Sequence, residues 1–160
     1  MAILDSILKL FLGDKSKTDI KAIQPIIKKI KEAEALLANI SNDELRAKTV
    51  LFKEKIVDDK KEILDKIADL KTKAVNTEDI DQKDDIYNQI DKLNEEAYEK
   101  TEETLKDILP EAFAVVKETA RRFTEYDTIE VTANSYDRTL SETKDYVELE
   151  GEKALSLIHI

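Results

Sequence analysis

Paired carboxylates are the side chains in this 160-residue sequence whose types could perform acid–base or metal chemistry. Adjacent pairs include Asp58-Asp59, Asp84-Asp85 and Glu102-Glu103. Neighbouring residues of a helix point about 100° apart, so the two carboxylates of such a pair do not converge on one ligand. His159 is the single histidine and there is no cysteine, which excludes histidine-pair metal sites, thiolate zinc sites and cysteine nucleophiles. The sequence therefore predicts neither catalytic residues nor metal ligands.

Glycine is also scarce, which limits the kinds of nucleotide-binding loop that the sequence can form. The only two glycines are Gly13 and Gly151, whereas a phosphate loop of the Walker type needs several at fixed spacing. We therefore expect no cofactor-binding residues in this chain. So few turn formers also argue against sandwiches, barrels and propellers, and favour a mainly helical fold.

Charge is unevenly distributed along the chain. Lys and Arg number 26 against 36 Asp and Glu, a net charge of −10. Residues 1–31 carry seven lysines and three aspartates, a net of +4. The acidic majority argues against nucleic acid as a partner, because affinity for phosphate depends on the available cations. The basic start suits an anionic membrane surface or an acidic partner.

Residues 1–13 have the pattern of an amphipathic helix that is too short to cross a bilayer. One interpretation places this helix in a membrane interface, with lysines beside lipid headgroups. The other buries its apolar side against the rest of the protein, and both remain open on the pattern alone. The candidate membrane-binding residues are Ile3, Leu4, Ile7, Leu8, Lys9, Phe11, Lys15 and Lys17.

Residues 16–123 are expected to form a helical region that contains a long antiparallel hairpin, about residues 42–108. Ser16 marks the first helix start, and Pro25 predicts a kink or a later start. Ser41 and Glu44 have capping-box spacing, and Thr77 can cap the second long helix. Pro110 should end that helix and open another. The apolar positions expected to line the hairpin and the last helix are Leu45, Phe52, Ile56, Ile63, Ile67, Leu70, Ala74, Ile86, Ile90, Leu93, Ala97, Leu105, Ile108, Phe113, Val116, Ala120 and Phe123.

After Phe123 the apolar period changes from that of a helix to that of a strand. Residues 128–133 and 145–150 alternate apolar and polar side chains, which is typical of half-buried strands. We expect them to pair as a small two-stranded antiparallel ribbon within residues 124–154. A lone ribbon is only marginally stable, so it needs a further surface to pack on.

Two segments contain sequence motifs, and the second motif is long and specific. The stretch from Ser41 to Thr49, followed by Phe52, has the pattern Ser-x-x-Glu-Leu-x-x-Lys-Thr-x-x-Phe, and the stretch from Leu109 to Arg122 contains Pro-Glu-Ala-Phe-Ala-Val-Val. Both resemble runs of the SecA family of bacterial preprotein translocase ATPases. The resemblance covers about residues 1–53 and 108–123, and it marks 54–107 and 128–150 as extensions. Residues 155–160 have no family counterpart, and we expect them to be a non-native tail.

The resemblance implies an amino-terminal fragment of a motor that couples ATP hydrolysis to preprotein export through the SecY channel. ATP and magnesium would bind to family motifs that this chain lacks, so the fragment alone should be inactive. Its implied location is the cytoplasm, peripheral on the cytoplasmic face of the inner membrane. The alternative is a free-standing helical coiled-coil interaction protein with a membrane-surface helix at its start. The oligomeric state stays undecided.

Overall fold

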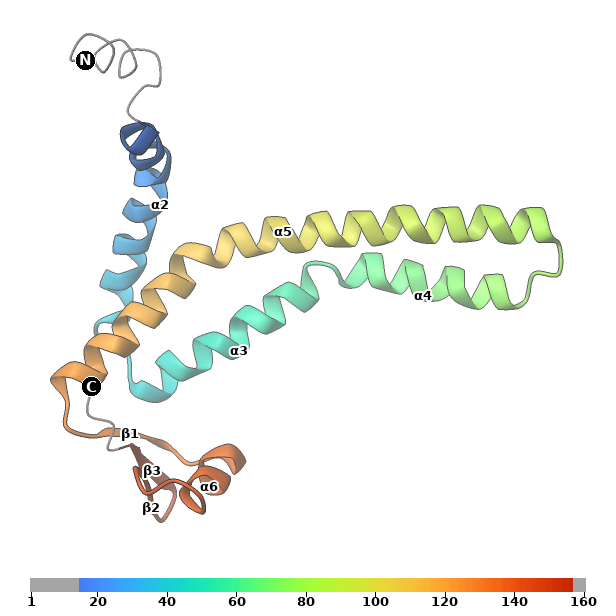
Figure 1. Ribbon diagram of the computed structural model, residues 1–160. Coiled ribbons are helices and arrows are strands. Elements are labelled where there is room, and N and C mark those ends of the chain that lie inside the picture. Colours follow the sequence, from blue (N-terminus) through green and yellow to red (C-terminus); the bar gives the residue numbers. More distant parts are fainter. Residues whose placement is uncertain (1–14, 157–160) are drawn as a thin grey trace, which may run out of the picture.

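A computed structural model describes residues 15–156 of the chain, with side chains from residue 19 onward. In this range a long helical hairpin extends from a base where another helix and a small sheet meet (Figure 1). The predominance of helix confirms the predicted class. The elements are α2 (Lys15–Leu37), α3 (Asn42–Asp58), α4 (Lys61–Val75), α5 (Ile80–Glu125), β1 (Ile129–Thr132), α6 (Ser135–Ser141), β2 (Val147–Glu150) and β3 (Lys153–Ser156).

The starts of α2 and α3 lie close to the predicted positions. α2 begins at Lys15, one residue before Ser16, and continues through Pro25. At α3 the Ser41 hydroxyl accepts a hydrogen bond from the Glu44 N–H (3.1 Å), and the Glu44 carboxylate accepts one from the Ser41 N–H (2.7 Å). That backbone N–H lowers the pKa of Glu44. The capping box is therefore confirmed, and it fixes where the chain enters the hairpin.

The first arm of the hairpin is two helices, whereas a single one was expected. α3 ends at Asp58 and α4 begins at Lys61. The Asp59 carboxylate between them accepts hydrogen bonds from Lys55 Nζ (2.9 Å) and from the hydroxyl of the buried Thr104 on α5 (2.8 Å). These two contacts lower the pKa of Asp59. Polar groups thus hold the break between α3 and α4 against α5. The spacing of apolar residues could not predict this break.

Beyond the break, α4 and α5 pack as the predicted hairpin. Asp79 caps α5 by accepting a hydrogen bond from the Gln82 N–H (2.8 Å). The Thr77 cap was wrong, because the Thr77 hydroxyl donates to the Lys73 carbonyl at the end of α4 (2.8 Å). The α4–α5 part of the predicted apolar seam is confirmed as one buried cluster, made of Ile63, Ile67, Ala74, Ile86, Ile90 and Ala97 with Leu70 and Leu93 against it. Two other expected members differ: Leu45 belongs to a separate cluster, and Leu105 is 41% exposed.

Pro110 does not end a helix. α5 runs for 46 residues from Ile80 to Glu125 with Pro110 inside it. Proline cannot donate the bond that the Lys106 carbonyl would accept, and its ring crowds that carbonyl. A proline in a helix interior commonly bends the helix, and α5 changes direction between its yellow and orange parts (Figure 1). Pro110 therefore divides α5 into a part before it that packs on α4 and a part after it that packs on the end of α2 and the start of α3.

The last third of α5 buries a different face from the expected one. Phe113 is 57% exposed and Val116 is 68% exposed. The buried side chains are instead Ala114, Val115, Glu118 and Arg122. Two of these four are charged, so the packed face could not be found from apolar spacing.

The sheet has three strands, and the two-stranded ribbon is corrected accordingly. β3 lies between β1 and β2 and pairs antiparallel with both. Gly151 (φ 63°) opens the two-residue turn from β2 to β3, a position that favours glycine. Leu155 and Ser156, assigned to the tail, are paired residues of β3; residues 157–160 lie outside the described part. The central strand was therefore missed, because the last two of its four residues were assigned to the tail and the first two to the end of the ribbon segment.

Candidate functional site

The base of the molecule, where the end of α2, the start of α3 and the last third of α5 meet, brings the two family-like segments together. Leu45 from the first segment is buried with Ala114 and Val115 from the second. Lys48 Nζ lies 2.9 Å from a Glu111 carboxylate oxygen, and this pair also joins the two segments. Residues more than sixty positions apart in the sequence thus form one packed unit.

Arg122 is the side chain that ties the three helices of the base. It is 6% exposed, and its Nε donates to Glu118 on α5 (2.8 Å). One terminal nitrogen donates to the Asn42 side-chain oxygen on α3 (2.7 Å). The other donates to the carbonyls of Leu37 (3.2 Å) and Ile40 (2.7 Å), where α2 ends. The last carbonyls of a helix have no partner within it, so Arg122 satisfies groups that burial would otherwise penalise.

Glu118, beside Arg122, is a buried carboxylate that stays ionised. Its side chain is 1% exposed and accepts two hydrogen bonds from Arg121 (2.9 and 2.7 Å). The Arg121 hydrogen bonds, with help from Arg122, outweigh burial and lower the pKa of Glu118 to about 2. The base is therefore held by paired buried charges as well as by apolar packing.

The first turn of α3 also holds the sheet. Asn42 Nδ2 donates to the Glu130 carbonyl (2.9 Å). The Asp43 carboxylate accepts from the backbone N–H (2.9 Å) and the hydroxyl (2.7 Å) of Thr132. These contacts occupy the edge of β1 that faces away from β3, which removes one free edge of the sheet.

Arg46 and Asp137 form the second link between the helices and the sheet region. The two terminal nitrogens of Arg46 donate to the two oxygens of Asp137 at 2.8 and 3.0 Å. Asp137 also accepts from the backbone N–H of Asn134 (2.9 Å) in the capping box of α6. Burial raises the pKa of Asp137, but the Arg46 and Asn134 hydrogen bonds outweigh it and the net pKa is lowered.

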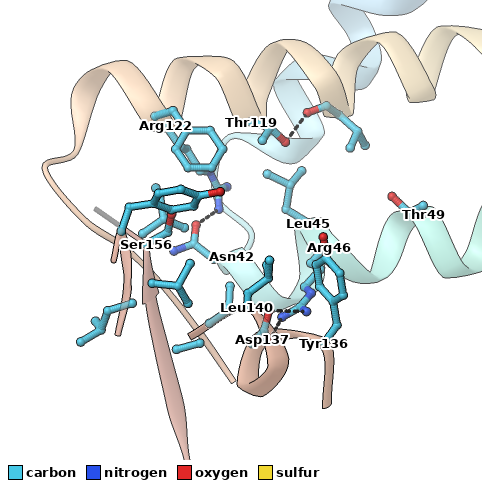
Figure 2. Close-up of a pocket in the computed structure, with 18 residues that line it drawn as sticks. Asn42, Leu45, Arg46, Thr49, Thr119, Arg122, Tyr136, Asp137, Leu140 and Ser156 are labelled. Carbon is cyan, nitrogen blue, oxygen red and sulfur yellow. Dashed lines mark hydrogen bonds and ion pairs between the residues drawn. The ribbon is translucent and has the colours of Figure 1, made fainter. Parts of the chain in front are cut away.

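A cavity of about 560 Å³ lies where the helices meet the sheet region, and Asn42, Arg46 and Asp137 are among the residues that line it. Figure 2 shows the Asn42–Arg122 and Arg46–Asp137 contacts at its edge, with residues of α3, α5, α6 and the strands around it. Its arginines already have acceptors, and most of its remaining wall is apolar, including Leu45, Val115 and Leu140. The cavity therefore suits an apolar group and offers no activated nucleophile.

Six of the eight candidate membrane residues, Ile3 to Phe11, lie outside the described residues. Lys15 and Lys17 are in the first turn of α2, in the part whose side chains are not described. Further along, α2 exposes Ile20, Ile23 and Ile26 together with Lys21, Lys28 and Lys29. The described part of α2 thus presents an exposed apolar and basic surface.

The residues that organise the base were missed from sequence. Asn42, Asp43 and Arg46 occur in the first family-like segment, and Arg122 ends the second. The spacing of Glu118 and Arg122 by four was the available signal, because such residues meet on one helix face.

Residues 15–156 contain no cluster of three or more His, Asp or Glu arranged to hold a metal ion. None of the helices in this range combines the length and apolarity needed to cross a bilayer.

Comparison with known proteins gives one consistent result. The SecA DEAD-like domain model matches residues 8–138. The protein translocase subunit SecA of Flavobacterium psychrophilum is 54% identical over 155 residues, covering 97% of this chain and 14% of that protein. The protein of the same name from Phocaeicola vulgatus is 47% identical over 92% of the chain and 13% of its own length. The chain thus spans about one seventh of these relatives. No solved structure was found to match it.

Proposed function

Because the chain belongs to the SecA family of protein translocase subunits, we propose that it forms the amino-terminal part of a motor that couples ATP hydrolysis to preprotein export through the SecY channel. The observation that supports this most is the 54% identity to a named translocase subunit over 97% of the chain. The packing of the two family-like segments into one base is consistent with it. Family membership also favours this function over a free-standing interaction protein.

Within such a motor, this part of the chain has a structural and membrane-proximal role. ATP and magnesium would bind outside it, because Gly151 serves a hairpin turn and Gly13 is the only other glycine. The chemistry of ATP hydrolysis therefore belongs to the rest of the motor, which would work at the cytoplasmic face of the membrane. In this proposal, the base and α2 connect residues 1–14 to the rest of the motor.

The test of this function is an exchange of parts. The corresponding residues of the Flavobacterium psychrophilum subunit are replaced by this chain, and preprotein import into inverted membrane vesicles is measured with ATP. We expect import within about threefold of the parent subunit, since the exchanged parts are 54% identical. A folded chimera that hydrolyses ATP but imports no preprotein would contradict the proposal.

Membrane attachment is a separate prediction. The full chain should float with anionic vesicles at low salt and remain unbound with neutral vesicles. Each lysine near an anionic surface contributes ~1 kcal/mol, and salt screens this attraction. Replacing Lys15 and Lys17 by glutamine should reduce the floated fraction severalfold. The same replacement at Lys71 and Lys73, equally spaced on α4, should leave it unchanged. Equal flotation with both kinds of vesicle at low salt would disprove the attachment.

A further inference from the structure

The outer face of α5 carries a second row of side chains, all of them exposed except the half-buried Glu102 at its end. Tyr87 is 50% exposed and Tyr98 is 68% exposed, and Ile80 at the start of the helix is 75% exposed. Between and beside the tyrosines stand acidic residues at steps of three and four. The row, named here the acid–tyrosine stripe, consists of Asp84, Tyr87, Asp91, Glu95, Tyr98 and Glu102.

The stripe is one straight face of the helix. At 100° per residue, its members fall within an arc of about 80°, and its ends are about 27 Å apart along the axis. The face that packs on α4, which includes Ile86, Ile90 and Ala97, lies about 130° round the helix. The stripe therefore points away from α4, and the hairpin does not bury it.

The acids of the stripe are available for an outside cation. In residues 19–156 none of the four forms a salt bridge, whereas Glu103, one residue from Glu102, pairs with Lys100 at 2.7 Å. Asn94, Glu95, Tyr98 and Glu99 also line a depression in this surface. A row of negative charge repels phosphate-bearing surfaces and a second copy of itself, and attracts a positively charged partner.

The tyrosines between these acids favour a positively charged partner that also has apolar side chains. An exposed tyrosine ring offers apolar contact area at low entropic cost, and its face attracts Lys and Arg cations. A fully hydrated polycation would gain little from the rings. A helix that presents aliphatic residues at three- and four-residue spacing, flanked by Arg and Lys, matches both the apolar and the charged members of the stripe.

We propose that the acid–tyrosine stripe is a docking surface for a basic amphipathic helix of another protein. The partner helix lies along α5 over about five turns. Its aliphatic residues contact Tyr87 and Tyr98, and its cations meet the carboxylates on either side. The interaction is salt-sensitive and reversible, because its charged contacts remain at the solvent-exposed edge.

The test uses a labelled synthetic 20-residue helical peptide with leucines at three- and four-residue spacing and Arg and Lys beside them. It is titrated with the full 160-residue chain, and the Kd is read from fluorescence anisotropy at 50 and 300 mM salt. We expect binding at low salt that weakens at least tenfold at high salt. A counterpart peptide with Glu in place of every Arg and Lys should not bind, and equal binding of both peptides would overturn the proposal.

Matched variants separate the stripe from the general negative charge of the chain. Asp84→Asn with Glu95→Gln should raise the Kd at least fivefold. Asp85→Asn with Glu96→Gln removes the same charges one residue further on, about 100° round the helix, and should change it less than twofold. Equal losses in the two pairs would show attraction to net charge alone and would overturn the proposal.

The tyrosines supply the second discriminating measurement. Tyr87→Ala with Tyr98→Ala should raise the Kd about tenfold, whereas Leu64→Ala, at an exposed position of α4, should leave it unchanged. Circular dichroism should show unchanged helix content, because both tyrosines are exposed. If sedimentation velocity shows that the chain self-associates and that the double tyrosine variant abolishes this, a second copy is the occupant and the proposal is wrong.

Discussion

Replacing Arg122 by alanine is expected to lower the free energy of unfolding by about 3–5 kcal/mol, the range for removing one partner from a buried charged pair. The substitution leaves the buried Glu118 carboxylate without one of its donors. It also orphans the Leu37 and Ile40 carbonyls and the Asn42 side-chain oxygen. The measurement is urea unfolding followed by circular dichroism at 222 nm.

Two controls define what the Arg122 result means. Arg122→Lys keeps the charge but cannot reach acceptors on three helices with one ammonium, so most of the loss should remain. Arg138→Ala removes an arginine whose side chain is 47% exposed and 3.9 Å from Glu152, and should cost less than about 0.5 kcal/mol. Similar costs at Arg122 and Arg138 would show that Arg122 does not tie the base together.

The second large effect is expected at Arg46, where alanine should loosen the sheet region from the helices. The pair with Asp137 is partly buried, and losing two charge-assisted hydrogen bonds should cost about 1–3 kcal/mol. Hydrogen exchange should accelerate in β1, β3 and α6, while amides of the α4–α5 hairpin keep their protection. Uniform acceleration along the chain would contradict a local link.

The same link should depend on pH in a defined direction. The pKa of Asp137 is lowered in the folded chain, so the Arg46–Asp137 coupling is present above the ordinary pKa of aspartate and is lost as the pH falls below it. A double-mutant cycle with Arg46→Ala and Asp137→Asn isolates this coupling from the capping role of Asp137. It should be measurable at pH 7 and reduced at pH 2.5.

Apolar periodicity predicted the parts of the fold in which apolar residues decide the packing. The seam of the hairpin is such a case, since its residues from Ile63 to Ala97 form one cluster. The capping box at Ser41 was equally accessible, because its chemistry lies within four residues. Family-like motifs located the base, although they did not reveal that the two motifs contact each other.

Several of the errors arose where contacts between residues distant in the sequence decided the structure. Asp59 breaks the first arm while bonded to Thr104, 45 positions away. Arg122 and Glu118 turn the last third of α5 so that Phe113 faces outward. Pro110 was expected to end a helix, yet packing of α5 on both sides of it keeps the helix continuous. The central strand was missed for a different reason, because two of its four residues, Leu155 and Ser156, were assigned to a tail.

The break at Asp59 and the buried Thr104 that faces it have a consequence for the length of the hairpin. Their hydrogen bond holds the start of α4 beside the facing part of α5, where the outer half of the hairpin joins the base. Insertion or deletion of matched whole turns in α4 and in the facing part of α5 would therefore change the length of the hairpin and leave the base intact. The length of the hairpin is therefore separable from the packing of the family-like segments on the inner side of that joint.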